Sequence, residues 1–406
     1  MLGALTKQRL YQYKNVMKSI FLKPSHIVLD RKALQKNIQF LKSRGKKGLK
    51  ISSVIKGNAY GHGISTYLPL AEEAGIDHFS VFSANEAEIA IQHRKNPQTK
   101  IMIMGMIRND ELDWAIENDV EFYLFDESRL QATISAAKKY QKKALIHLQI
   151  ETGMNRTGFE ENRWTELFQI LKNESEFVTI EGLCTHYAGA ESIANYYRIQ
   201  EQDKQLKKAI ELATKILGFK PKIHASSSAA FLTHPDKHYD MVRIGIAQYG
   251  FWPSRETYMH HIKSVNAEGA DDPLKRVLTW KSEIMSVKQI KAGDFIGYGN
   301  VYLAGKDMTI ATVPIGYTHG FGRNLTNTGF VLVDGVRCGV VGLVNMNMIT
   351  INVSHIEGVS KGDEVVIIGR QKEDEITLAS FGEMTNNLNY EVLTRLPTTI
   401  PRVIIH

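Results

Sequence analysis

The sequence predicts an α/β protein that joins an N-terminal (β/α)8 TIM-like barrel to a C-terminal all-β domain. In the first part of the chain, short apolar runs rich in β-forming residues alternate with longer stretches of helical periodicity. Strands separated by helical crossovers pair in parallel, and eight such runs within roughly two hundred residues fit a closed barrel better than an open sheet. The apolar runs are residues 51–55, 78–82, 101–104, 121–125, 144–150, 180–184, 222–225 and 241–246.

The pattern of apolar residues changes in the last third of the chain. Its apolar runs follow one another without long helical stretches, and turn signals such as Asp334-Gly335 separate them. This pattern predicts a separate all-β domain. The expected strands are residues 281–287, 308–313, 329–333, 336–344, 349–353 and 364–368.

These patterns divide the chain into four parts. We expect an N-terminal extension at 1–26, the barrel at 27–253, a connecting loop or insertion at 254–274, and the β domain at 275–406. The extension mixes lysine and arginine with short apolar pieces and lacks a continuous apolar run followed by a small-residue cleavage site. We therefore expect an extra surface helix there in place of a secretory signal, and a cytoplasmic protein.

The composition excludes several classes of protein. Of 406 residues, 43% are hydrophobic and 23% are charged, which is typical of a globular chain. No run of eighteen apolar residues occurs, so no membrane span is expected. The formal charge is +7, but the positive residues are scattered, and the densest cluster, 44–50, is typical of a solvated turn and not of a nucleic-acid site. Cys184 and Cys338 are too few for a disulfide framework or a zinc site, so no metal is expected.

A lysine at the end of the first barrel strand carries the strongest functional signal. Lys56 opens the string Lys-Gly-Asn-Ala-Tyr-Gly-His-Gly at residues 56–63. Burial at a barrel mouth lowers the pKa of an ammonium group, and Schiff-base chemistry requires the neutral amine. A lone lysine in such a place is more often a surface cation. The whole string, however, closely resembles the cofactor-lysine signature of alanine racemases, the bacterial fold-type III enzymes that use pyridoxal 5′-phosphate.

Further segments resemble the same family and follow in its order along the chain. Each tripeptide alone would be a weak signal, but the ordered series is specific, and the resemblance extends from about residue 27 to 403. The segments are 151–158 (ETGMNRTG), 185–186 (TH), 224–229 (HASSSA), 243–246 (RIGI), 297–299 (GYG), 314–317 (PIGY) and 389–392 (NYEV).

The resemblance implies two catalytic residues. Lys56 would hold pyridoxal 5′-phosphate covalently and act as acid or base on the D face of the substrate. Tyr298 would serve the L face, because racemisation needs acid–base groups on opposite sides of one α-carbon. In this family the neighbouring subunit delivers that tyrosine, which implies a homodimer with two shared active sites. A turn tyrosine that packs its ring is the alternative for Tyr298, and the flanking Gly297 and Gly299 argue against it.

The resemblance also implies the residues that would hold the cofactor. Arg243 would face the pyridine nitrogen and keep it unprotonated, since an arginine does not readily give up a proton. His186 would orient Arg243, and the alternative is a core histidine at a strand end. The phosphate-binding set would comprise Tyr60, Ser228, the backbone N–H groups of Gly245 and Ile246, and Tyr390.

On the substrate side, Arg156 would bind the carboxylate, helped by the backbone N–H of Met346. Tyr317 would narrow the pocket, which favours a methyl side chain over a long one. Several positions depart from the family, among them Gln149, Asn347 and the pair Thr318-His319. Gln149 stands where a lysine, often carbamylated, is usual, and Asn347 replaces an aspartate. These departures affect the substrate side and leave the predicted reaction type unchanged.

The implied function is interconversion of L- and D-alanine, which supplies D-alanine for peptidoglycan. We expect a small amino-acid substrate and neither nucleic acid nor membrane as a partner. A broader-specificity racemase for serine, lysine, arginine or similar amino acids remains an alternative, as does a non-catalytic protein that binds pyridoxal phosphate. Such binding proteins are single barrels, so the β domain argues against the second. A decarboxylase of this fold would carry a catalytic cysteine and a glycine-rich phosphate loop, and neither appears at the required place in the sequence. A metal-dependent lyase would need a C-terminal His/Cys pair, but Cys338 lies too early and His406 stands alone.

Overall fold

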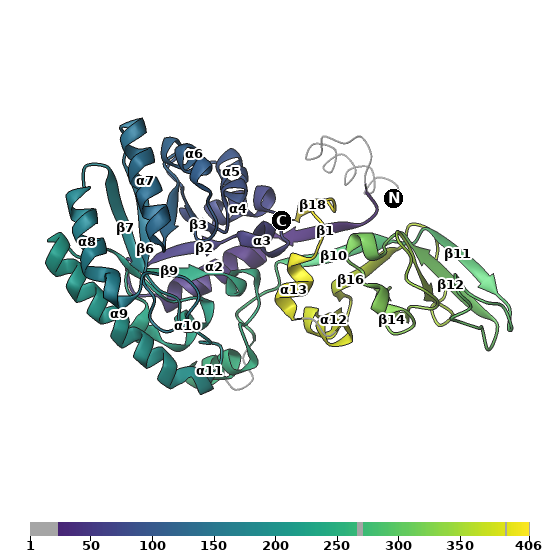
Figure 1. The fold of residues 1–406 in the computed structure, drawn as a ribbon. Helices are drawn as coiled ribbons and strands as arrows, with labels where there is room; N and C mark the ends of the chain where they lie inside the picture. Colours follow the sequence, from purple (N-terminus) through teal and green to yellow (C-terminus); the bar gives the residue numbers. More distant parts are fainter. Residues whose placement is uncertain (1–22, 266–270, 386–387, 406) are drawn as a thin grey trace. The chain divides into compact units, whose positions relative to one another are not determined.

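The computed structural model describes residues 23–265, 271–385 and 388–405, which form two compact units. The barrel unit contains residues 32–59 and 67–276, and the sheet unit contains the other described residues. Figure 1 shows the elements of both units with their labels. The surface helix expected in the N-terminal extension falls almost wholly on residues 1–22, which lie outside the described part of the chain.

Parallel strands form the barrel, in the order β8-β7-β6-β5-β4-β3-β2-β9. The ring closes just beyond β8, where Ser227 and Arg243 form a parallel bridge and the N–H of Arg243 donates to the carbonyl of Ser226 at 2.9 Å. Helices surround these strands (Figure 1). The predicted (β/α)8 architecture is confirmed, because every expected run overlaps one strand. The strands are β2 (Lys50–Val54), β3 (His78–Val81), β4 (Lys100–Ile103), β5 (Glu121–Leu124), β6 (Ala144–Gln149), β7 (Val178–Cys184), β8 (Ile223–His224) and β9 (Met241–Ile244).

Amphipathic periodicity and local capping explain the barrel helices. In α7 (Glu127–Tyr140), the side chain of Asp126 accepts a hydrogen bond from an N–H of the first turn, which would otherwise lack a partner. Leu130, Ile134 and Ala137 lie on its buried face. Among the described helices, none is long and apolar enough to cross a membrane. The other helices are α2 (Arg31–Arg44), α4 (Ile64–Glu73), α5 (Ala84–His93), α6 (Leu112–Glu117), α8 (Trp164–Asn173), α9 (Tyr196–Leu217), α10 (Ser228–Thr233) and α11 (Arg255–Val265).

The sheet unit is built on two sheets, as the predicted β domain requires. The larger has the order β14-β13-β16-β10-β1-β18, with β17 paired to β16, and the smaller has the order β11-β12-β15. Two short helices, α12 (Leu378–Thr385) and α13 (Asn389–Thr394), also belong to this unit. The strands are β1 (His26–Asp30), β10 (Leu278–Glu283), β11 (Ser286–Ile290), β12 (Met308–Val313), β13 (Phe330–Val333), β14 (Val336–Gly339), β15 (Ile349–Asn352), β16 (Glu364–Gln371), β17 (Asp374–Ile376) and β18 (Arg402–Ile405).

The first strand differs from the sequence-based expectation, which assigned everything from residue 27 to the barrel. Strand β1 pairs antiparallel with β10 and parallel with β18, so it belongs to the sheet unit. Its central residues Ile27, Val28 and Leu29 are at most 4% exposed, as expected for a strand with a neighbour on each side. The partners of β1 lie some 250 residues or more away in sequence, and no local pattern identifies them.

Two further differences concern the connection between the domains and the strand that follows it. The stretch 254–274, expected as a loop, contains helix α11. The single strand expected at 281–287 is two strands, because the chain changes sheets between them. The N–H of Ile284 donates to Asp363 O at 2.9 Å, whereas that of Met285 donates to Thr312 O at 2.8 Å.

Candidate active site

The predicted residues of the barrel gather at the carboxyl ends of its strands. Lys56 follows β2, His186 follows β7, Ser228 follows β8, and Arg243 lies in β9. The loops at this end of a (β/α)8 barrel converge, and active sites of this fold are built there. These four side chains therefore belong to one end of the barrel unit.

An unusual backbone conformation follows Lys56. The residues 57–60 have φ angles between 50° and 63°, all in the left-handed region. That conformation costs a non-glycine residue roughly 1–2 kcal/mol, so its surroundings must hold the turn in place. Glu86 contributes to this, because its carboxylate accepts hydrogen bonds from the N–H of Asn58 at 3.2 Å and of Phe82 at 2.9 Å. Strain of this kind concentrates at functional sites, and here it begins at the predicted catalytic lysine.

The surroundings of Lys56 lower the pKa of its ammonium group. Burial is the largest cause, and the positive charges of Arg156 and Arg243 add to it, while Glu86 acts in the opposite direction. Solvent nevertheless reaches the side chain. A lower pKa increases the share of neutral amine, which is the form that attacks a carbonyl group.

Arg243 is a buried cation, with 5% of its surface exposed. One terminal nitrogen of its guanidinium donates to Nδ1 of His224 at 2.6 Å. The other donates to the carbonyl oxygens of Thr185 at 2.8 Å and Ala225 at 2.9 Å. All these acceptors are neutral and an arginine keeps its proton, so the strand ends hold a fixed positive charge.

His186 lies beside that charge, with its Nδ1 3.4 Å from a terminal nitrogen of Arg243. Burial, followed by the positive charges of Arg243, Arg156 and Lys56, lowers the pKa of His186 to about 3. The imidazole is therefore neutral at physiological pH and accepts a hydrogen bond from Arg243 at Nδ1. This arrangement agrees with the orienting role that the sequence suggested.

The serines of residues 226–228 have different partners. The hydroxyl oxygen of Ser228 accepts a hydrogen bond from the N–H of Gly245 at 2.9 Å, which brings two of the predicted phosphate ligands together. Ile246 follows directly in the chain. The hydroxyl of Ser226 instead donates to the carbonyl of Lys237 at 2.7 Å, deep in the unit. Ser228 is thus the serine that faces the Gly245 backbone.

The loop that carries Arg156 is organised by Glu151. Its carboxylate accepts hydrogen bonds from the backbone N–H groups of residues 153–156, at 2.5, 2.7, 2.9 and 3.4 Å. Burial would raise the pKa of Glu151, but these four bonds outweigh it and the pKa lies below its ordinary value. The guanidinium of Arg156 is exposed, and no side chain in the described ranges accepts a hydrogen bond from it.

Gln149 occupies the position at which the family usually has a lysine. It is 6% exposed, and its side-chain oxygen accepts a hydrogen bond from the hydroxyl of Thr157 at 3.1 Å. This acceptor is therefore used within the loop and supplies no charge to Arg156.

The other predicted residues lie in the sheet unit. The rings of Tyr60 and Tyr390 lie with centroids 6.0 Å apart, and burial, then Tyr390, raises the pKa of Tyr60, so its phenol stays protonated. Tyr298 stands between Gly297 and Gly299, which have φ angles of 75° and 74°. Its side chain is 71% exposed, so the ring does not pack against its own turn.

Tyr317 and Met346 lie on two adjoining loops of this unit. The N–H of Tyr317 donates to Asn345 O at 3.1 Å, and the N–H of Thr318 donates to Met346 O at 3.1 Å. The hydroxyl of Thr318 also donates to the side-chain oxygen of Asn347 at 2.7 Å. The structure therefore brings the predicted substrate-side residues of this unit together.

Two residues of the site were not identified from the sequence. His224 opens the HASSSA segment, but nothing in that string indicated that its imidazole accepts from Arg243. Glu86 lies in α5, and only its spacing of four residues from Phe82 could have indicated a contact with the loop after β3.

A (β/α)8 barrel with a lysine at the end of its first strand, followed by a sheet domain, defines the fold-type III class of proteins. Models of the alanine racemase N-terminal and C-terminal domains match residues 29–253 and 277–404. The alanine racemase of Leptospira interrogans (serovar copenhageni) is 34% identical over 389 residues, which cover 94% of this chain and 96% of the relative. That of Symbiobacterium thermophilum is 33% identical and covers 94% and 97%.

Solved structures agree with these matches. The alanine racemase of Clostridium difficile 630 superposes with a TM-score of 0.85 at 29% identity, covering 95% of this chain and 96% of that one. The alanine racemase of Bacillus anthracis, solved with bound L-Ala-P, gives a TM-score of 0.85 at 28% identity and covers 96% of each chain. This chain therefore belongs to the alanine racemase family.

Proposed function

We propose that this chain interconverts L- and D-alanine with pyridoxal 5′-phosphate held on Lys56, and that it supplies D-alanine for peptidoglycan in the cytoplasm. The observation that carries the proposal is that Lys56, with its lowered pKa, lies at the same barrel end as the buried cation Arg243. The relatives named above are alanine racemases, and the bound L-Ala-P of one of them supports alanine as the substrate.

The residues at the strand ends fit this cofactor. Lys56 offers an amine for its aldehyde. The two terminal nitrogens of Arg243 already donate hydrogen bonds to protein acceptors. Its Nε–H has no acceptor among the described residues, so this group would be the one that faces the ring nitrogen of the cofactor. The oxygen of Ser228 accepts from Gly245, so its O–H can donate to the phosphate, as can the N–H of Ile246. The family resemblance adds Tyr60 and Tyr390 to this phosphate-binding set.

When bound, the cofactor withdraws electrons from the substrate and makes the α-proton acidic. Lys56 then takes or returns that proton on the D face, and Tyr298 does so on the L face. Arg156 and the N–H of Met346 hold the carboxylate, and Tyr317 restricts the side chain to a small group. Each proton transfer needs a group within hydrogen-bond reach of the α-carbon.

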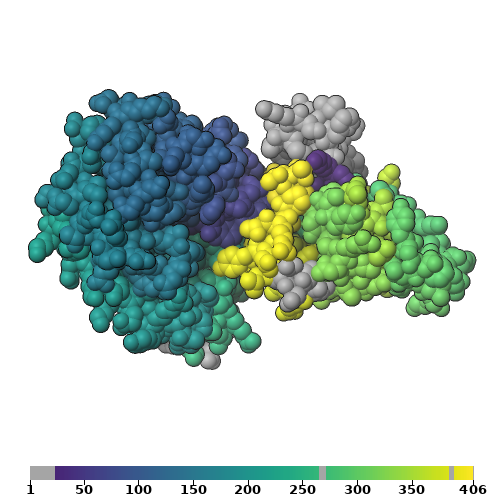
Figure 2. All heavy atoms as spheres, viewed as in Figure 1, coloured from purple at the N-terminus to yellow at the C-terminus, as the bar shows by residue number. Residues whose placement is uncertain are grey.

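We infer a homodimer in which Tyr298 of one subunit completes the site of the other. The hairpin that carries Tyr298 exposes several apolar side chains, and contiguous exposed apolar surface marks interaction sites. In Figure 2 the part of the sheet unit near residue 300 is drawn in green. The exposed fractions are 54% for Phe295, 71% for Tyr298, 41% for Val301 and 55% for Leu303.

Two experiments test the proposal. Borohydride reduction of the yellow protein should fix the cofactor to Lys56, and Lys56→Ala should lose it on dialysis. Retained, reducible cofactor in that variant would show that the assignment is wrong. A panel of L-amino acids assayed for their D-products should give alanine as the best substrate. A broader-specificity racemase, which Gln149 and Asn347 keep open, would turn over serine, lysine or arginine much faster.

A further inference from the structure

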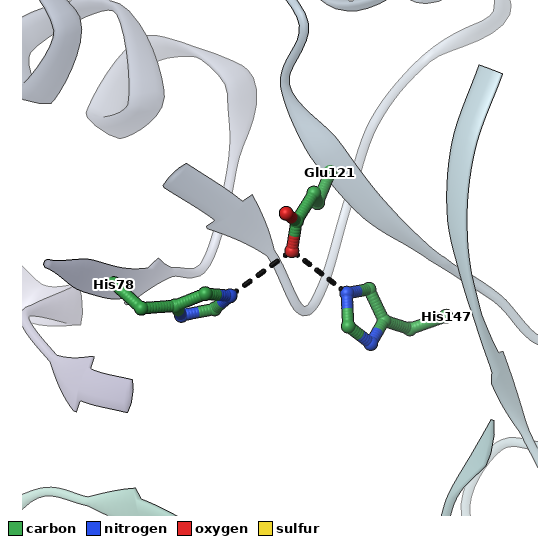
Figure 3. Close-up of side chains that lie close together, drawn as sticks. All are labelled: His78, Glu121 and His147. Atoms are coloured by element: carbon green, nitrogen blue, oxygen red, sulfur yellow. Dashed lines mark hydrogen bonds and ion pairs between the residues drawn. The ribbon is translucent and has the colours of Figure 1, made fainter. Parts of the chain in front are cut away.

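A chain of buried polar side chains runs through the barrel interior from Arg243. Nδ1 of His224 lies 2.6 Å from Arg243, Nε2 of His224 lies 2.8 Å from Nδ1 of His147, and Nε2 of His147 lies 2.9 Å from Oε2 of Glu121. The same oxygen lies 3.0 Å from Nε2 of His78, and Figure 3 shows the two imidazoles pointing at it from opposite sides. Every member of the chain is at most 5% exposed.

The two ends of this chain fix the direction of every hydrogen bond in it. An arginine can only donate, so Nδ1 of His224 accepts. Burial and then Arg243 lower the pKa of His224 well below its ordinary value, so this imidazole is neutral with its proton on Nε2. That proton is donated to Nδ1 of His147, whose pKa burial also lowers. His147 therefore carries its proton on Nε2 and donates it to Glu121.

The other end is an anion. Burial would raise the pKa of Glu121, but the hydrogen bonds from His147 and His78 outweigh it and hold the pKa well below its ordinary value. An ionised carboxylate can only accept, so it receives both Nε2–H groups. Nδ1 of His78 in turn lies within hydrogen-bond distance of the hydroxyl oxygen of Ser52, at 2.8 Å. Each buried donor in the chain thus has an acceptor.

The donor-to-acceptor directions of these hydrogen bonds argue against a metal ion between His78, Glu121 and His147. These residues are the one group of three possible metal ligands among the described residues. A metal would take the lone pair of Nε2 of His147 and move its proton to Nδ1. Nε2 of His224 would then accept, and His224 would turn an N–H toward Arg243. Two donors would face each other across 2.6 Å, so the contact of Arg243 permits the hydrogen-bonded arrangement and not the metal.

Gly182 of β7 makes room for the central bond of this chain. A Cβ added to this glycine would overlap Nδ1 of His147 and lie 2.9 Å from Nε2 of His224. The glycine is not in the left-handed region, so the missing side chain, not the backbone conformation, is what this position requires. The contact between the two imidazoles is thus built into the strand.

We propose that Glu121 is a positioning residue for Arg243. By accepting Nε2–H of His147, it favours the tautomers that offer Nδ1 of His224 to the guanidinium, and its charge polarises that acceptor through both imidazoles. Arg243 is then held in one orientation and linked to a buried anion. That this orientation of Arg243 matters for the cofactor ring rests on the proposed function. The assignment of the histidine tautomers does not depend on it.

Nitrogen NMR of the holoenzyme with isotope-labelled histidine tests the proposal directly. In the wild-type protein, His147 and His224 should both be neutral with the proton on Nε2, and added zinc should leave their resonances unmoved. A proton on Nδ1 of either residue, or a shift with zinc, would overturn the proposal. Failure of the proposed function would instead appear as absence of cofactor from the wild-type protein.

Variants test the link from charge to Arg243. Glu121→Gln keeps an acceptor oxygen and removes the charge, so the Nδ1 resonance of His224 should move toward that of a weaker acceptor, with kcat about tenfold lower. Gly182→Ala should move the same resonance without any change of charge. The matched control is Asp203→Asn, which removes a buried carboxylate bonded to Lys237. An unmoved His224 resonance in both folded variants, or an equal shift in the control, would contradict the proposal.

Discussion

Replacing Glu151 by glutamine is expected to weaken substrate binding more than it slows the chemical step. The carboxylate holds the turn of residues 153–156 through four backbone N–H groups at 2.5–3.4 Å, and that turn carries Arg156. Glutamine keeps one acceptor oxygen, but its NH2 group then faces two N–H donors. Two of the four bonds are therefore lost.

The size of the effect follows from those two bonds. A hydrogen bond to a charged group contributes roughly 1.5–3 kcal/mol, and since solvent reaches part of Glu151, the lower end applies to each. Part of the resulting ~3 kcal/mol appears as lower stability of the turn. If about half appears as poorer binding, KM for alanine rises roughly tenfold, because 1.4 kcal/mol is a factor of ten. We expect kcat to change much less.

Steady-state kinetics with L-alanine, detecting D-alanine, measures both constants. Glu160→Gln is the matched control, because this exposed residue lies on the same loop and its side chain accepts no hydrogen bond at the following turn. An unchanged KM in folded Glu151→Gln, or a fall in kcat alone, would refute the reasoning. The pKa of Glu151 is depressed in the folded state, so its stabilisation is present above the unfolded value of about 4.3 and is lost as pH falls through the folded value. The acid limb of the stability curve should be shallower in the variant.

Four other outcomes follow. Tyr298→Phe should suppress turnover strongly while the visible absorbance of the cofactor stays, because the phenol oxygen is lost and the ring remains. Mixing Lys56→Ala and Tyr298→Phe subunits should restore part of the activity, and no recovery after verified exchange would contradict a shared site. Activity should not depend on bicarbonate, since Gln149 cannot be carbamylated; strong activation by bicarbonate would place a carbamate on another lysine. Because the pKa of His186 falls to about 3, stability should decrease as pH drops below the unfolded value of about 6.5 toward 3, and a denaturation series in His186→Asn should show a smaller decrease.

The barrel could be predicted because each of its strands is a short apolar run bounded by turn residues or a helical stretch. Such signals are local, and the lysine string after β2 is local as well. The sheet membership of β1 could not be predicted, since it depends on pairing with β10 and β18 at the other end of the chain. The split of residues 281–287 depends likewise on partners distant in sequence.

The residues of the candidate site likewise divide into those that local motifs predict and those that only the folded barrel brings together. Lys56, Arg156 and Arg243 stand in contiguous motifs that resemble a family. His78, Glu121 and His147 stand alone in three different strands, with separations of 43 and 26 residues, and only the closed barrel brings them into contact. A single sequence contains no signal for such a cluster.

The most direct test of the central claim is exchange of the α-hydrogen of alanine in deuterated water. We assign Lys56 to the D face and Tyr298 to the L face of the substrate. Folded Tyr298→Phe holoenzyme should therefore still exchange the α-hydrogen of D-alanine, without racemising it, and should fail to exchange that of L-alanine. Equal exchange of both enantiomers, or exchange of L-alanine alone, would contradict the assignment of the two faces.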